Sequence, residues 1–90
     1  MAECWWLYLL MCRDGRTYAG IATDVASRLA VHSSGKGAKF TRSNPPVRVL
    51  GVQAFSSRSE AQKAEAALKK LPRTKRLAWA VSVTTAAAAP

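Results

Sequence analysis

The sequence predicts a small α+β domain in which a mainly antiparallel three-stranded sheet is flanked by helices, in the order β-β-α-β-α-α. Three observations predict it. An apolar run near the N-terminus is broken by a turn signal, later segments carry apolar residues at helical spacing, and 90 residues suit one domain. We assign residues 1–81 to that domain and residues 82–90 to a flexible Ala-rich tail.

Each element is predicted from its own turn, cap or periodicity signal. The continuous apolar run at residues 4–12 is typical of a strand that is covered on both faces. The Asp14-Gly15 pair then predicts a hairpin. After the run we expect a strand at 17–21, a helix at 25–33 capped by Thr23 or Asp24, and a loop at 34–46. A strand at 47–55 follows, with Gly51 as a candidate bulge. The last two elements are a helix from the capping box Ser57-x-x-Glu60 to Leu71 and a short helix from Pro72 to about Trp79.

The register of the first hairpin decides whether two tyrosines can meet. A two-residue turn would put Tyr8 and Tyr18 on opposite faces of the sheet. A three-residue loop with Gly15 in the left-handed conformation would pair Tyr8 with Gly20 and bring both tyrosines to one face. We expect the second register, with Gly20 leaving open backbone beside Tyr8. The alternative is that both tyrosines are ordinary packing residues.

The charge balance indicates a polyanionic partner. Fourteen Lys and Arg oppose five acidic residues, a formal net charge of +9 that attracts polyanions. Nucleic acid fits best, with DNA favoured over RNA, whereas an acidic protein partner or a merely soluble basic surface would also explain the charge. Membrane-surface binding is disfavoured, because no helix combines a basic face with a bulky apolar one.

The N-terminal segment indicates a cytoplasmic protein. The apolar run from Trp5 to Cys12 is too short to span a bilayer, and no basic stretch or cleavage site marks a signal peptide. Cys4 and Cys12 lie eight residues apart on one strand, too far apart to be bridged, so we expect both to be reduced.

The first helix carries two polar residues on its expected apolar face. Val25, Arg28, Leu29 and His32 share that face at i, i+3, i+4 and i+7 spacing. A histidine there is usually a satisfied core residue. Next to Arg28, whose planar fork can hold two phosphate oxygens, a phosphate-facing role is an equal alternative.

Glu65 is the second candidate. It borders the apolar stripe of the later helix, which comprises Ala61, Ala64, Leu68 and Leu71. A single carboxylate facing a cleft could hold a hard divalent ion that keeps most of its waters. The simpler interpretation is an exposed glutamate that pairs with Lys69 one turn later.

The loop before the third strand is basic and glycine-rich. Its cations Lys36, Lys39 and Arg42 suit contacts with a phosphate backbone, and Phe40 could stack on a base. The spacing of a Walker A phosphate-binding loop is absent.

Taken together, these residues resemble the GIY-YIG nuclease superfamily over residues 4–80. Leu7-Tyr8-Leu9 and Tyr18-Ala19-Gly20 stand where that family has its two triplets, ten residues apart between the tyrosines. The resemblance is closest to the small, single-domain bacterial members of the UPF0213 type. The other matching features are Thr23-Asp24 before a helix with Arg28 and His32, one later Glu65, and the stretch at residues 35–42. The sequence departs from the family in the residues around Tyr8, in Ala19 for the usual Ile, and in lacking a late Asn and a separate DNA-binding domain.

This resemblance implies a divalent-metal-dependent endonuclease that uses Mg²⁺ or Mn²⁺. Tyr8 would accept the proton of the attacking water, with its pKa lowered by nearby positive charge. Tyr18 and His32 would orient groups or relay protons, and Arg28 would bind the scissile phosphate. Glu65 would hold the metal ion. A protein partner could supply target specificity, and a nucleic-acid-binding module without activity is the alternative function.

Overall fold

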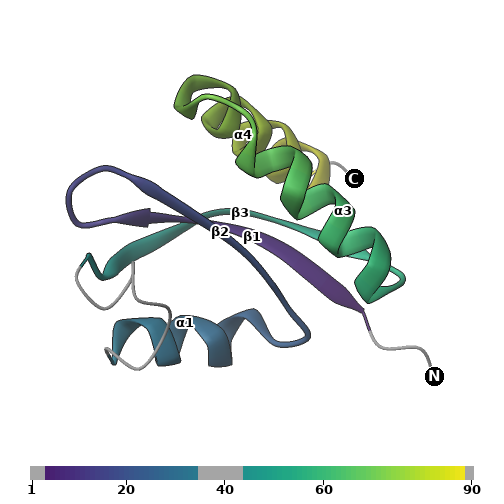
Figure 1. Cartoon of the computed structure of the whole chain (residues 1–90), viewed down its shortest axis with the longest axis horizontal. Helices are drawn as coiled ribbons and strands as arrows, with labels where there is room; N and C mark the ends of the chain where they lie inside the picture. Colours follow the sequence, from purple (N-terminus) through teal and green to yellow (C-terminus); the bar gives the residue numbers. More distant parts are fainter. Residues whose placement is uncertain (1–3, 35–43, 89–90) are drawn as a thin grey trace.

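The computed structural model describes residues 4–34 and 44–88. Three antiparallel strands form a sheet in the order β2-β1-β3, with α1 on one face and α3 and α4 on the other (Figure 1). The elements are β1 (Trp5–Cys12), β2 (Thr17–Ala22), α1 (Val25–Ser33), β3 (Pro46–Phe55), α3 (Arg58–Lys69) and α4 (Arg73–Ala88). The predicted fold class and element order are confirmed.

The hairpin between β1 and β2 is closed by the three-residue loop 13–15. The Cys12 N–H donates to the Arg16 carbonyl at 2.8 Å, so these two residues flank the loop. Gly15 has φ of +89°, in the left-handed region that glycine enters without steric cost. A type of loop that needs one left-handed residue therefore forms where the sequence supplies the glycine.

This loop sets the register of the two strands. Tyr8 lies opposite Gly20, and Leu10 lies opposite Tyr18. Since side chains alternate between faces along a strand, Tyr8, Leu10 and Tyr18 all lie on the same face of the sheet. The expected three-residue register is confirmed, and the two-residue alternative is excluded.

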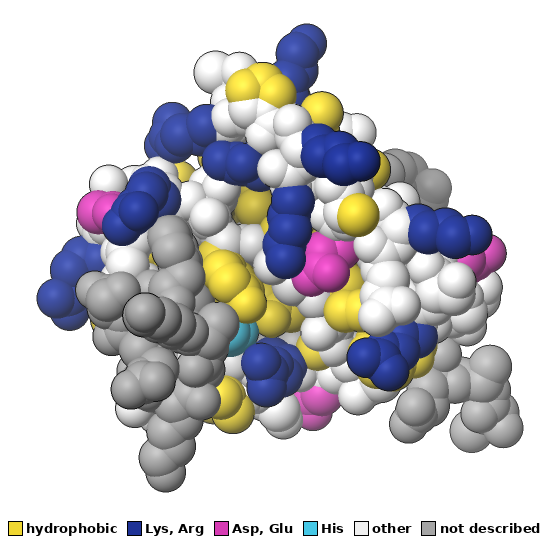
Figure 2. Space-filling model, viewed as in Figure 1, with side chains coloured by type: hydrophobic (Ala, Val, Ile, Leu, Met, Phe, Trp, Pro, Cys, Tyr) yellow, Lys and Arg dark blue, Asp and Glu magenta, His cyan; other side chains and the backbone are white. Residues whose placement is uncertain are grey.

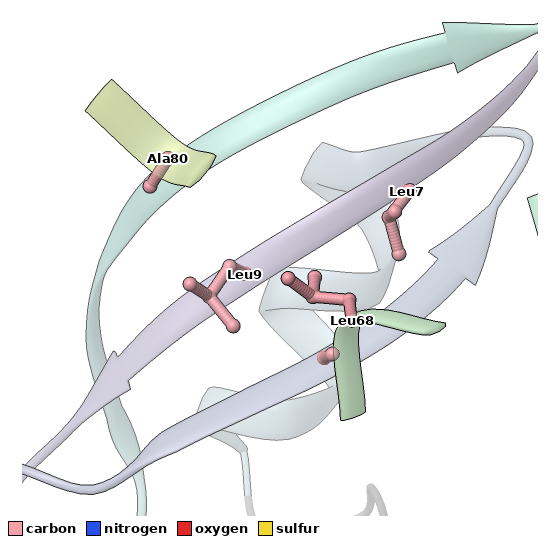
Figure 3. Packing of buried hydrophobic residues seen from close by; sticks show 5 residues of the cluster. Leu7, Leu9, Leu68 and Ala80 are labelled. Carbon is pink, nitrogen blue, oxygen red and sulfur yellow. The ribbon is translucent and has the colours of Figure 1, made fainter. Parts of the chain in front are cut away.

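The opposite face carries the larger apolar cluster. Leu7 and Leu9 of β1 are fully buried and pack with Leu68 of α3 and Ala80 of α4 (Figure 3). Burial of each such leucine contributes about 1.5–3 kcal/mol by transfer from water. The alternation along β1 thus ties α3 and α4 to one face of the sheet and leaves the tyrosines for the other.

Helix α1 covers the tyrosine face. Val25 and Leu29 pack there against Tyr8, Leu10 and neighbouring residues. The central strand β1 is thus covered on both faces, as its continuous apolar run predicts.

Side-chain caps start two of the helices. The Asp24 carboxylate accepts a hydrogen bond from the Ser27 N–H at 3.1 Å, so Asp24 is the N-cap of α1. The Ser57 hydroxyl accepts from the Glu60 N–H at 3.2 Å and caps α3. The Glu60 carboxylate accepts from the Ser56 hydroxyl at 2.8 Å, which holds it at the start of the helix.

The pairing of β3 with β1 has two irregularities, and one of them falls one residue before the expected position. The register against β1 shifts so that Leu50 is the extra residue, next to Gly51. The glycine at position 51 is explained by packing and not by the bulge. A Cβ there would lie 3.0 Å from Ala80 Cα, so the glycine lets α4 approach the strand.

Two expectations about the helices are wrong. Helix α4 continues to Ala88, nine residues past the expected end near Trp79, because alanine is the strongest helix former. Leu71, expected on the buried stripe of α3, is 37% exposed, since α3 ends at Lys69. The flexibility expected of residues 82–90 stays a prediction.

The two cysteines are free. Cys12 is buried at the end of β1 and Cys4 is exposed just before it. In the part of the chain that the structure describes, no helix combines the length and the apolar character needed to cross a bilayer.

Candidate active site

Three aromatic rings meet between the sheet and α1. The Tyr8 hydroxyl and His32 Nε2 lie 3.1 Å apart in a buried hydrogen bond. The ring of Tyr18 meets that of His32 edge to face, with centroids 5.1 Å apart. Tyr8 is 2% exposed and His32 is 0% exposed, so this hydrogen bond is shielded from bulk water. His32 is therefore a hydrogen-bonded core residue, which is also the arrangement that a proton relay needs.

Gly20 makes room for the Tyr8 hydroxyl at the edge of the sheet. A Cβ at Gly20 would collide with that hydroxyl and would lie 2.6 Å from the ring carbon that bears it. Strand β2 is an edge strand, so the phenol lies against open backbone on this side. Only a glycine fits beside Tyr8 here, and the role of Gly20 in the site stays a prediction.

Arg28 lies one turn before His32 on α1, and its side chain is exposed. Its guanidinium reaches the tyrosine and the histidine electrostatically, because it lowers the pKa of both. An exposed cation beside two buried proton-transfer groups can hold a phosphate at the surface next to them. That is the position expected of a phosphate-binding arginine.

The pKa of Tyr8 contradicts the expected direction. Burial of the phenol raises its pKa above 10.0, and the hydrogen bond and charge of Arg28 lower it by less. Tyr18 and Glu65 add to the rise, because a phenolate would be repelled by their negative forms. Tyr8 is therefore neutral near pH 7 and can accept a proton only by giving its own to a neighbour.

His32 is the neighbour that can take that proton. Burial lowers the pKa of His32 below its usual 6.5, and the positive charge of Arg28 lowers it further. The imidazole is then neutral near pH 7. With its own proton on Nδ1, it accepts the Tyr8 proton at Nε2.

The depressed pKa of His32 makes folding stability depend on pH. The unfolded chain binds a proton at His32 below pH 6.5, whereas the folded chain does so only at lower pH. We therefore expect the free energy of unfolding to fall as the pH drops below about 6.5. Urea titrations between about pH 4.5 and 6.5 would measure this, since Asp14 and Asp24 have pKa values below 3.8 and titrate outside that window. His32→Gln keeps an acceptor without titrating, and it should flatten the dependence; an equally steep dependence in that variant would contradict the prediction.

Glu65 lies on α3, on the far side of the β2 edge from α1. Its side chain is 23% exposed, and its charge reaches the Tyr8 phenol. The Lys69 ammonium lies 3.6 Å from its carboxylate, so the pairing that the simpler interpretation expects is also present. A metal ion at Glu65 would have to compete with an exposed lysine, whose ion pair is weak.

The donor set around Glu65 fits a hydrated hard cation. Among residues 4–34 and 44–88, no group of three or more His, Cys, Asp or Glu side chains is arranged to hold a metal. One carboxylate, with water and substrate phosphate completing the shell, is how Mg²⁺ is usually bound. Glu65 is therefore suited to Mg²⁺ or Mn²⁺ and unsuited to a structural zinc site.

The structure thus brings five of the predicted side chains into one region at the β2 edge. They are Tyr8, Tyr18, Arg28, His32 and Glu65. Figure 2 shows many Lys and Arg side chains over this face of the molecule and few Asp or Glu. The catalytic roles of these residues stay a prediction. The predicted nucleic-acid contacts at Lys36, Lys39, Phe40 and Arg42 lie outside the described residues.

Sequence reasoning missed the residue that anchors the end of the basic loop. Asn44 is 5% exposed, and its amide donates to the Asp14 carboxylate at 2.6 Å. In return the Asp14 N–H donates to the Asn44 side chain at 3.2 Å. The Asn44-Pro45 dipeptide is a turn signal that could have identified this position.

Comparison with known proteins decides the family. The model of the GIY-YIG catalytic domain matches residues 4–78. This chain belongs to the GIY-YIG family. The matched residues contain the whole sheet, α1, α3 and the start of α4, and the family indicates a nuclease-type fold.

Several GIY-YIG relatives carry the description UPF0213 protein. One from Cupriavidus pinatubonensis is 56% identical over 75 residues, which cover 83% of this chain and 83% of the relative. One from Xanthomonas axonopodis pv. citri is 51% identical over 75 residues, which cover 83% of this chain and 74% of the relative.

A solution NMR structure of a protein from E. faecalis has a TM-score of 0.62 at 40% identity and covers 89% of this chain and 85% of that one. That of a UPF0213 protein from Bacillus halodurans has a TM-score of 0.51 at 44% identity, with coverage of 81% and 78%. The GIY-YIG resemblance found in the sequence is confirmed.

Proposed function

We propose that the protein is a divalent-metal-dependent endonuclease that hydrolyses phosphodiester bonds in nucleic acid, with DNA favoured over RNA. The observation that carries the proposal is the buried Tyr8–His32 hydrogen bond of 3.1 Å, set beside the exposed guanidinium of Arg28. A phenol held against a neutral imidazole is a proton relay, and an adjacent arginine brings a phosphate to it.

The protein residues perform the proton transfer in one chain of steps. An attacking water gives a proton to the Tyr8 oxygen as the Tyr8 proton passes to His32 Nε2. The hydroxide formed attacks the phosphorus of the phosphate held by Arg28, the bond from phosphorus to the leaving oxygen breaks, and His32 is left as an imidazolium. The leaving oxygen takes up a proton from solvent, and His32 returns its proton through Tyr8 to solvent before the next turnover. The relay avoids a free phenolate, which the raised pKa of Tyr8 disfavours. Tyr18 orients the imidazole through its edge-to-face contact.

Glu65 would hold the Mg²⁺ or Mn²⁺ ion, which when bound supplies charge stabilisation at the leaving oxygen. Glu65 belongs to α3 and Arg28 to α1, and these helices cover opposite faces of the sheet. A phosphodiester lying along the β2 edge would then have a cation on each side.

The surrounding charge would hold the polyanion. The net charge of +9 and the basic side chains on this face favour the binding of nucleic acid. We assign Lys36, Lys39 and Arg42 to the phosphate backbone and Phe40 to a base. We also place the protein in the cytoplasm, as a single domain over residues 1–81 whose target choice a protein partner could refine.

Binding centred on the basic loop should depend strongly on salt. If Lys36, Lys39 and Arg42 each neutralise one phosphate, the slope of log K against log salt should be at least about −2 to −3. Fluorescence anisotropy with a labelled duplex, measured over a range of NaCl concentrations, gives this slope. Replacing all three with Ala should flatten it by that amount, and an unchanged slope would place the binding surface elsewhere.

A cleavage assay tests the proposed activity. Branched, flapped, nicked and single-stranded substrates should be incubated with Mg²⁺ or Mn²⁺, and at least one should be cut. The rival function is a binding module without activity, and the 2% exposure of Tyr8 favours it, because water must reach a buried hydroxyl. Tight binding without cleavage of any of these substrates would establish the rival.

A further inference from the structure

A cavity of about 360 Å³ lies beside the candidate active site, where β2 leads into α1. Its lining includes Trp5, Ile21, Asp24, Ser27 and Arg28. Arg28 belongs to both places, so a nucleic acid whose phosphate is held by Arg28 would have its next chemical group at this cavity. The mechanism above uses no other residue of the lining.

The walls of the cavity suit a nucleobase. Trp5 provides an aromatic ring, and the Arg58 guanidinium lies over that ring at 5.6 Å from its centroid. Ile21 supplies an apolar wall, and the volume is in the range of small-ligand sites. Aromatic rings that stack on bases typically strengthen binding by roughly 5- to 150-fold per base.

Asp24 makes its side of the cavity, away from Arg28, unsuitable for a phosphate. One of its oxygens accepts from the Ser27 N–H, and hydrogen bonds from the start of α1 keep its pKa below 3.8, so it is charged near pH 7. A carboxylate only accepts hydrogen bonds. It repels a phosphate but accepts from the exocyclic amino group of a base, as acidic side chains do with cytosine N4.

The spacing along α3 places this cavity next to the reacting centre. Arg58, which covers Trp5, and Glu65, which reaches Tyr8, are seven residues apart on the same helix. Seven residues are close to two turns, or about 10.5 Å, so both side chains leave the same face of α3. Helix α3 packs against β1 and β2, so its first residue lies by Trp5, which lines the cavity, and its Glu65 turn lies near Tyr8.

We propose that this cavity receives an unpaired base of the nucleotide next to the scissile phosphate, with preference for a base that carries an amino group. The inference rests on the proposed function for the identity of that phosphate. A base that is paired and stacked in a duplex cannot enter the cavity, whereas an unpaired base enters at little cost. The substrate class is therefore nucleic acid with unpaired nucleotides at the cut, such as a single-stranded tail or flap.

Abasic scanning without metal tests the base site. The probes are labelled duplexes with a 5′ or a 3′ single-stranded tail, and an abasic nucleotide replaces each tail position in turn. Binding is measured by anisotropy in a chelator with the full chain. At one position near the junction, loss of the base should weaken binding about fivefold or more. Equal affinities at every position would overturn the proposal.

Two variants assign that penalty to the cavity. Trp5→Ala should abolish the abasic penalty, whereas Trp5→Phe should keep most of it. Should Trp5→Ala fail to fold, Ser27→Phe fills the cavity from an exposed helical position while keeping the backbone N–H that Asp24 caps. The penalty should vanish there too, and an undiminished penalty in a folded variant would overturn the assignment.

A change of one base tests the amino-group preference. With cytosine at the sensitive position, binding should be tighter than with thymine, and Asp24→Asn should remove the difference while keeping a good N-cap. Equal binding of the two bases by the unaltered chain would overturn this part. All these binding measurements omit metal, so they are independent of the cleavage assay. A position-specific binding penalty in a protein that cuts no substrate would contradict the nuclease function alone. Cleavage at a rate that no abasic position changes would contradict the base site alone.

Discussion

Glu65→Ala is expected to abolish divalent-dependent cleavage and to leave metal-free binding of nucleic acid intact or slightly tighter. Glu65 is the carboxylate on α3 whose charge reaches Tyr8, and its removal would leave the hydrated cation without its protein ligand. The change also removes a negative charge from a face rich in Lys and Arg, which favours the polyanion. Cleavage rates with saturating Mg²⁺ or Mn²⁺, together with anisotropy in a chelator, separate the two effects.

Glu60→Gln is the matched control. Glu60 lies on the same helix and carries the same charge, but its carboxylate is bound to the Ser56 hydroxyl at the N-terminus of α3. It should cut at the rate of the unaltered chain. If Glu65→Ala retained metal-dependent cleavage, or if Glu60→Gln lost it equally, the metal would have to be bound elsewhere or the loss would reflect net charge.

Lys69 is paired with the proposed metal ligand. Its ammonium lies 3.6 Å from the Glu65 carboxylate and must move away when a cation binds there. Exposed pairs at i, i+4 contribute only about 0.3–0.5 kcal/mol, so we expect the lysine to weaken the proposed metal binding slightly without preventing it. The ion pair and the metal site are therefore compatible.

The backbone features of the site could be predicted from local signals. Asp14-Gly15 and the spacing of Tyr8 and Tyr18 limited the hairpin to two registers, and only one of them brings both phenols to a single face. Helix α1 begins and ends where its cap and periodicity predict, which places Arg28 and His32 one turn apart. These features depend on a few neighbouring residues, so the sequence contains what determines them.

The chemistry inside the site could not be predicted in the same way. The direction of the Tyr8 pKa depends on how far the phenol is desolvated, and that depends on how α1 packs on the sheet. Sequence reasoning counted the nearby positive charge and not the burial. The position of the β3 irregularity at Leu50 likewise depends on pairing with a distant strand.

The Trp5 cavity was missed for a similar reason. In the sequence, Trp5 is one more apolar residue of a predicted buried strand. Arg58 lies in the capping box of a predicted helix far along the chain, and nothing in the sequence connects the two residues. Only the fold places the guanidinium over the ring. Contacts between residues so distant in sequence have no local signature.

Tyr8→Phe is expected to reduce the cleavage rate at saturating substrate by roughly 10²- to 10⁴-fold, the usual contribution of a positioned acid–base group. The ring and its packing against α1 remain, and only the hydroxyl that joins the attacking water to His32 is lost. Loss of that hydroxyl removes the buried hydrogen bond to His32, so the free energy of unfolding should fall by about 0.5–1.5 kcal/mol. Assays belong at a temperature where circular dichroism shows the variant folded.

Comparison with Arg28→Ala distinguishes proton transfer from phosphate binding. Arg28→Ala should slow cleavage by roughly 10²-fold or more and should also weaken binding, because the guanidinium would contact the phosphate directly. Tyr8→Phe should leave binding unchanged.

The pH profile separates a relay from a packing role. In the unaltered chain the rate should fall in acid as His32, whose pKa lies below 6.5, becomes protonated and can no longer accept the Tyr8 proton. The residual rate of Tyr8→Phe should lose that acid limb, since the imidazole is no longer connected to the water. A purely structural role for Tyr8 would lower the rate at every pH alike. Full activity in Tyr8→Phe would mean that another group activates the water.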